Sequence, residues 1–156
     1  MSAHRMTRAL LALAVVLAAG TATTACSDEE LLGHTPDEVE PEGLTISIGG
    51  QTAVTVQAGQ VTGSLTVQAG NETENFTVVF TDHDGQPLDP EESDFVVEGQ
   101  SADEATAEFH RIAAFTGHLE GHAAGETTIV FKLMHPPGPD AHSNFDSPPI
   151  PVTVTP

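Results

Sequence analysis

The strongest constraint on the fold is the pattern of the chain from residue 43 to residue 156. Short runs rich in Thr, Val, Ile and Phe are separated by Gly, Asp and Pro, and no segment shows a helical period. Runs of this length and spacing are typical of a β-sandwich or barrel. We therefore predict one all-β domain with strands at 44–48, 53–57, 64–68, 76–81, 95–98, 106–110, 113–121, 127–135 and 150–155.

The alternation of apolar residues indicates which face of each predicted strand is buried, because successive side chains on a strand point to opposite faces. One modest core results from this phasing. Its predicted members are Phe76, Val78 and Phe80; Ala105, Ala107 and Phe109; Phe115 and Leu119; Ile129, Phe131 and Leu133; and Ile150, Val152 and Val154.

The segment from Leu119 to Ile129 resembles the penultimate hairpin of bacterial immunoglobulin-like domains, in which a small-residue turn ending in Gly precedes an alternating Thr and Ile strand. The resemblance implies an immunoglobulin-like Greek-key β-sandwich and a role in cell-surface or adhesion proteins. The chain has one cysteine and no tryptophan, so it has neither the disulfide nor the buried Trp of antibody-type domains.

The first 25 residues have the three-part pattern of a secretory signal peptide. A short basic start containing Arg5 and Arg8 is followed by the apolar run 9–19 and a small, polar end. That run is shorter than the ~20 residues of a membrane-spanning helix. Residues 26–42 are rich in acids and poor in aliphatics, so we expect an extended, disordered tether before a folded domain at 43–156.

The only cysteine, Cys26, directly follows the predicted signal peptide. Together with Thr23, Thr24 and Ala25 it resembles a bacterial lipobox, which implies cleavage before Cys26 and lipidation of that residue. Ser27 and the acids after it resemble lipoproteins sorted to the outer membrane, on its periplasmic face or at the cell surface. The alternative is ordinary cleavage after Ala25, which leaves a free thiol.

The charge balance excludes several classes of function. The chain has 23 Asp and Glu against 4 Lys and Arg, and beyond the signal peptide only Arg111 and Lys132 are basic. Such a surface repels phosphate backbones, so we expect no nucleic-acid partner.

Without Trp or Tyr the chain also lacks the usual stacking platforms for carbohydrate. No nucleophile elbow or glycine-rich phosphate loop is present, and we predict a protein that is not an enzyme.

Histidine is the one residue type that this composition leaves unexplained, because five of the eight histidines lie between His110 and His142. In strand phase His118, Glu120 and His122 form an outward row of imidazole and carboxylate, which suits zinc or copper. Same-face neighbours on a strand are ~6.7 Å apart. His118 and Glu120 can therefore share one ion, whereas His118 and His122, at ~13 Å, cannot unless the strand bends.

Further ligands must come from other strands. If a turn at 123–126 pairs His122 with Thr127, then His118 lies opposite Phe131 and the loop 136–149 can fold back over the sheet. A metal cluster is then predicted from His110, His118, Glu120, His122, His135 and His142. The alternative is a solvated surface row that binds no ion.

The leading functional hypothesis is thus a lipid-anchored extracytoplasmic module that binds zinc or copper and serves as carrier, buffer or delivery partner to a metal-transport protein. A rival of another class is a metal-free interaction or adhesion-type accessory domain. A third uses the same histidines as a pH-sensing surface. Metal binding should weaken as imidazole becomes protonated near pH ~6.5, which separates the first hypothesis from the second.

Overall fold

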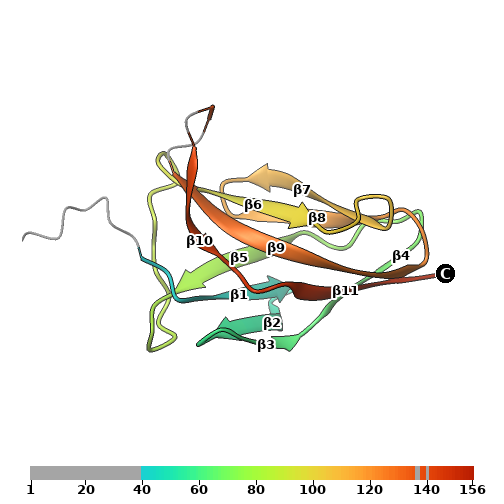
Figure 1. The fold of residues 1–156 in the computed structure, drawn as a ribbon, viewed down its shortest axis with the longest axis horizontal. Coiled ribbons are helices and arrows are strands. Elements are labelled where there is room, and N and C mark those ends of the chain that lie inside the picture. Colours follow the sequence, from blue (N-terminus) through green and yellow to red (C-terminus); the bar gives the residue numbers. More distant parts are fainter. Residues whose placement is uncertain (1–39, 136–137, 140) are drawn as a thin grey trace, which may run out of the picture. The chain divides into compact units, whose positions relative to one another are not determined.

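A computed structural model of the protein describes residues 40–135, 138–139 and 141–156. These residues form strands and no helix (Figure 1). None of them belongs to a helix long and apolar enough to cross a membrane. The predicted signal peptide, Cys26 and most of the predicted tether lie outside the described residues.

The strands form two sheets. The first has the order β3 (Gln60–Gly63), β2 (Gln51–Gln57), β1 (Gly43–Ile48), β5 (Phe76–Thr81), β8 (Thr116–Gly121) and β7 (Ala107–Ala113). The second sheet is centred on β9 (Gly125–His135), with β6 (Val96–Ser101) on one side of it. On the other side of β9 lie β10 (His142–Asp146) and β11 (Ile150–Thr155). The strand β4 (Leu65–Gln68) pairs with β11 at the edge of this sheet.

This order defines an immunoglobulin-like Greek-key sandwich. The neighbours β1, β5, β8 and β7 correspond to strands A, B, E and D of that fold, and β6, β9 and β11 correspond to C, F and G. The strand β4 runs parallel to the last strand, β11, and the β2–β3 hairpin extends the first sheet beyond strand A. The predicted fold class is confirmed.

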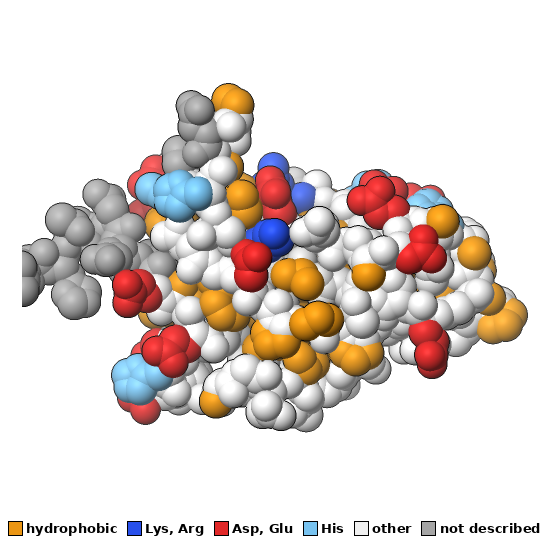
Figure 2. All heavy atoms as spheres, in the orientation of Figure 1, with side chains coloured by type: hydrophobic (Ala, Val, Ile, Leu, Met, Phe, Trp, Pro, Cys, Tyr) orange, Lys and Arg blue, Asp and Glu red, His pale blue; other side chains and the backbone are white. Residues whose placement is uncertain are grey.

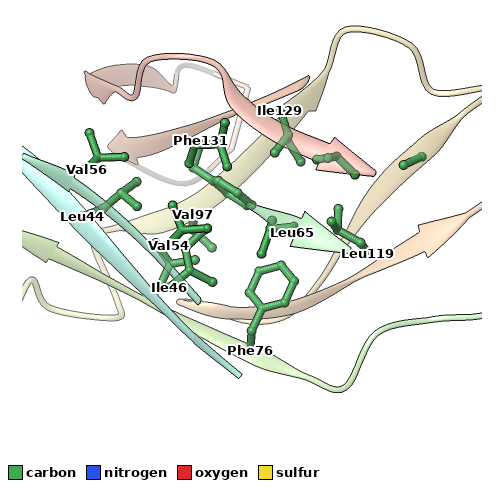
Figure 3. Packing of buried hydrophobic residues seen from close by; sticks show 14 of the residues in the cluster. Leu44, Ile46, Val54, Val56, Leu65, Phe76, Val97, Leu119, Ile129 and Phe131 are labelled. Carbon is green, nitrogen blue, oxygen red and sulfur yellow. The ribbon is translucent and has the colours of Figure 1, made fainter. Parts of the chain in front are cut away.

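The core lies between the two sheets and contains most of the predicted residues. Leu44, Phe76 and Leu119 of the first sheet and Val97 and Phe131 of the second point into the same space (Figure 3). Two parts of the prediction differ from the structure. Ala105 is exposed in the turn before β7, and Phe109 and Phe115 are only partly buried at the margin of the core.

The predicted hairpin between 113–121 and 127–135 is wrong. The strands β8 and β9 belong to different sheets, so His122 does not pair with Thr127 and His118 does not lie opposite Phe131. Instead β8 pairs with β7, which places His118 opposite His110. The turn 122–124 carries the chain across the sandwich, because the Greek-key order requires a crossover at this point.

The aromatic ring of Phe109 lies against two glycines, Gly117 on the adjacent strand β8 and Gly99 on β6 of the other sheet. A Cβ atom at Gly117 would overlap that ring and would lie 2.5 Å from the carbonyl oxygen of His110. We expect Gly117→Ala to lower the free energy of unfolding by about 1–3 kcal/mol, because an added methyl group forces the backbone or ring to shift.

Urea unfolding measures this effect, with Gly125→Ala as the matched control. At Gly125 the nearest atom to an added Cβ is Thr106 Cγ2 at 3.7 Å, an ordinary contact. Equal losses in the two variants would contradict the role given to the Phe109 contact.

Candidate metal centre

The hairpin of β7 and β8 carries alternating histidines and glutamates on the outer face of the first sheet. Gly117, Leu119 and Gly121 face the core, so His118 and Glu120 face outward. The register pairs Glu108 with Glu120 and His110 with His118. Figure 2 shows histidine side chains beside carboxylates over this part of the molecule.

Four of these side chains form a closed ring of contacts. The Nε2 atom of His110 lies 3.1 Å from Glu120 Oε2 and 3.8 Å from Glu108 Oε2. On the other side of the ring, His122 Nε2 lies 3.6 Å from Glu108 Oε2, and His122 Nδ1 lies 3.8 Å from Glu120 Oε1. The two histidines are therefore brought to the same pair of carboxylates from opposite ends.

Local structure explains how His122 reaches this ring. It follows β8 directly, and its backbone N–H donates a hydrogen bond to Thr106 O at 2.9 Å, which holds it beside the start of β7. The carboxylate of Glu108 lies between His110 and His122 and contacts both rings. The ~13 Å expected between His118 and His122 on one straight strand thus does not keep His122 out of the cluster. His122 shares its two carboxylates with His110 of the neighbouring strand instead.

His118 extends the cluster toward the adjoining chain segment. Its ring centre lies 5.4 Å from that of His110, and its Nε2 lies 3.7 Å from Glu72 Oε2. Only 15% of its side chain is exposed. Glu72 forms an isolated bridge with Glu120, so the segment before β5 lies along β8.

Two imidazole nitrogens of the cluster lack hydrogen-bond partners. They are His110 Nε2 and His118 Nδ1, both shielded from solvent. His110 Nε2 lies 3.1 Å from Glu120 Oε2, but this contact does not count as a hydrogen bond. A buried polar atom without a partner costs free energy, so these nitrogens favour a ligand or a side-chain rearrangement.

Three carboxylates, Glu72, Glu120 and Glu108, lie side by side across adjacent backbone segments. Like charges in directly opposed positions destabilise a sheet. Neither basic side chain of the described region offsets them, because Lys132 pairs with Asp146 at 3.3 Å and Arg111 donates a hydrogen bond to Val97 O. Within the described region this leaves the imidazoles, or a bound cation, to balance the charge.

The contact distances are close to those between ligands of one ion. Two ligands on a tetrahedral zinc are about 3.4 Å apart, because each is bound at ~2.0–2.2 Å. Among the described residues no three such side chains already surround a common point in the way a metal requires. Side-chain rotation would have to turn the four groups of the ring toward one central point, and these side chains are about two-fifths exposed.

The structure divides the predicted ligands into two groups. His110, His118, Glu120 and His122 come together on the first sheet. His135 and His142 belong to the second sheet, where they pair with each other. The predicted single cluster depended on the wrong hairpin and on a loop folding over the sheet; part of that loop instead forms β10.

Two residues of the cluster were missed by the sequence analysis, Glu108 and Glu72. Glu108 stands two residues before His110, in the same strand phase, and this spacing was the available signal. Glu72 carries no comparable signal, because it lies outside any strand and is one of many acids.

Comparison with known proteins gives little further information. No family model and no curated protein matches the chain. A solved structure similar to it is the crystal structure of the S-layer protein SbsC domains 4 and 5, with 21% identity and a TM-score of 0.39. The match covers 66% of this chain and 44% of that one, so the chain spans less than half of the S-layer structure. The fold is defined here by the strand pairing.

Proposed function

We propose that the protein is an exported, lipid-anchored binding domain whose ligand is a divalent transition metal ion, zinc or copper. The observation that carries the proposal is the closed ring of His110, Glu120, His122 and Glu108. Neutral imidazoles supply nitrogen and the carboxylates supply charge and oxygen, a ligand set that zinc and copper accept.

Electrostatics support a cation at this position. A divalent ion offsets the repulsion within the row of Glu72, Glu120 and Glu108, which no lysine or arginine of the described region does. The acidic composition of the chain adds to the effect, since a negative surface raises the local concentration of cations.

The lipobox-like segment ending in Cys26 supports an anchor in the membrane, with residues 26–42 as the tether. In this proposal the protein sits on the outer membrane, at its periplasmic face or at the cell surface. It acts as a carrier or buffer and hands metal to a transport protein, and it catalyses no reaction.

A second candidate function is a metal-free interaction domain of the accessory or adhesion type. One observation favours it. The strand β3, at the edge of the first sheet among the described strands, has no charged residue and no proline, features that usually protect exposed edges from pairing with another chain. The strand is short, however, and offers few backbone groups to a partner.

Calorimetric titration of the purified, metal-free protein with zinc and then copper(II) at neutral pH tests the first proposal. We expect tight binding that His110→Ala weakens by about 10–100-fold, because that imidazole contacts both carboxylates of the ring. The matched control is His83→Ala, since His83 is 70% exposed and its contact is with Asp84, outside the cluster.

The same titration at pH 5.5 separates the two candidates. Imidazole binds metal only as the neutral base, so under the first proposal the affinity for zinc should fall steeply there, whereas a metal-free interaction domain gives no tight binding at either pH. Weak heat from several sites, unchanged by His110→Ala, would refute the metal proposal.

A further inference from the structure

We propose that His135 and His142 form a second, separate metal site that takes copper(II) or a similar nitrogen-preferring ion. This site lies in the second sheet, on strands that contribute nothing to the cluster of β7 and β8. It goes beyond the proposed function and does not depend on it, because no ligand is shared.

The strand register places the two histidines side by side, as a chelating pair requires. His142 of β10 stands directly opposite His135 of β9 in an antiparallel ladder, so both side chains project from the same face. Their ring centres are 5.6 Å apart. Two imidazoles bound to one tetrahedral ion have ring centres about 5.2 Å apart, because each metal–nitrogen bond is ~2.1 Å. The two rings stand at 89° to each other, so the exposed ring of His142 must turn before a nitrogen of each ring faces the same ion.

One of the two ligands is already held in place. The ring of His135 stacks on Phe95, with ring centres 4.5 Å apart and an interplanar angle of 27°. Phe95 is itself only 2% exposed, so it is a fixed part of the core. His142 is exposed and leaves the remaining coordination positions open to water. Preorganisation of one ligand lowers the entropy cost of binding.

The chemistry of this pair differs from that of the first cluster. No carboxylate of the described residues contacts either ring, whereas every histidine of the first cluster contacts one. An all-imidazole pair without added charge relies on metal–nitrogen bonding alone. Copper(II) forms the strongest such bonds among the divalent first-row ions, so it is the metal this site should select.

Copper(II) added in small steps to the purified, metal-free protein tests the proposal, with the imidazole NMR signals as the readout. Bound copper(II) is paramagnetic and broadens the signals of its own ligands first. We expect the signals of His135 and His142 to broaden together, at a copper concentration too low to broaden the signal of His83.

Two variants make the result decisive. In His142→Ala, broadening of the His135 signal should need about 10²-fold more copper, since the chelate is lost. In the double variant His110→Ala/His122→Ala, the response of His135 and His142 should be unchanged, so failure of the first cluster is distinguishable from failure of this one. The proposal would be overturned if the His135 signal of His142→Ala broadened at the same copper concentration as in the native protein. It would also be overturned if the His135 signal of the native protein broadened only at the copper concentration that broadens His83.

Discussion

Replacing Phe131 by alanine is expected to lower the free energy of unfolding by about 3–5 kcal/mol, the range for truncation of a fully buried phenylalanine. Phe131 is 0% exposed and lies on the central strand of the second sheet. Its ring makes edge-on contacts with Phe76 and Phe109 of the first sheet, at 6.0 and 5.2 Å between ring centres. Truncation therefore leaves a cavity where the two sheets meet.

Chemical denaturation checks this value, and Ile112→Ala is the control. Ile112 is a large aliphatic side chain with 55% exposure, so its truncation should change stability by no more than about 0.5 kcal/mol. Since a domain of this size has only about 5–15 kcal/mol of stability, Phe131→Ala should leave it marginally folded. Similar losses in both variants would contradict the packing described for the core.

Glu120→Gln is expected to have opposite effects on stability with and without metal. Without metal, the substitution removes the central charge from the row of Glu72, Glu120 and Glu108 and should raise the free energy of unfolding by ~0.2–1 kcal/mol. With zinc at 100 times its dissociation constant, the native protein gains about 2.7 kcal/mol from binding. The variant should lose most of that gain because its weakened site binds little zinc.

Denaturation curves recorded with and without zinc measure both effects in one experiment. Glu104→Gln is the matched control, since Glu104 is an exposed carboxylate in the turn before β7 and is not among the carboxylates that contact the histidines of the cluster. It should behave like the native protein under both conditions. A Glu120→Gln protein that is less stable than the native one without metal would show that the carboxylate row is not under electrostatic strain.

Much of the sandwich could be predicted because burial on one face leaves a period of two in the sequence. The ends of β5 and β11 agree with prediction, since Phe76, Val78 and Phe80 and the last strand's aliphatics alternate cleanly. The strands β3 and β10 were missed. Each is short and mostly polar, and each is held by pairing with a neighbour rather than by a buried face of its own.

The cluster was only partly predictable, because alternation indicates which face a side chain occupies and not which strand lies beside it. His118, Glu120 and His122 were assigned to one outward row from phase alone. Their actual neighbours, His110 and Glu108, depend on β8 pairing with β7 instead of β9. A turn of small residues is compatible with either a hairpin or a crossover, so the sequence around Ala123 did not decide between them.

The directions of the first and last strands give the domain a mechanical property. The strand β1 enters the sandwich at one end and β11 leaves it at the other (Figure 1). A force that pulls Glu40 and Pro156 apart therefore acts along the axes of both strands. It must slide β1 past β2 and β5, and β11 past β4 and β9, so all hydrogen bonds of a ladder resist together. A domain loaded in this way withstands tension along the chain far better than one whose strands unzip one bond at a time.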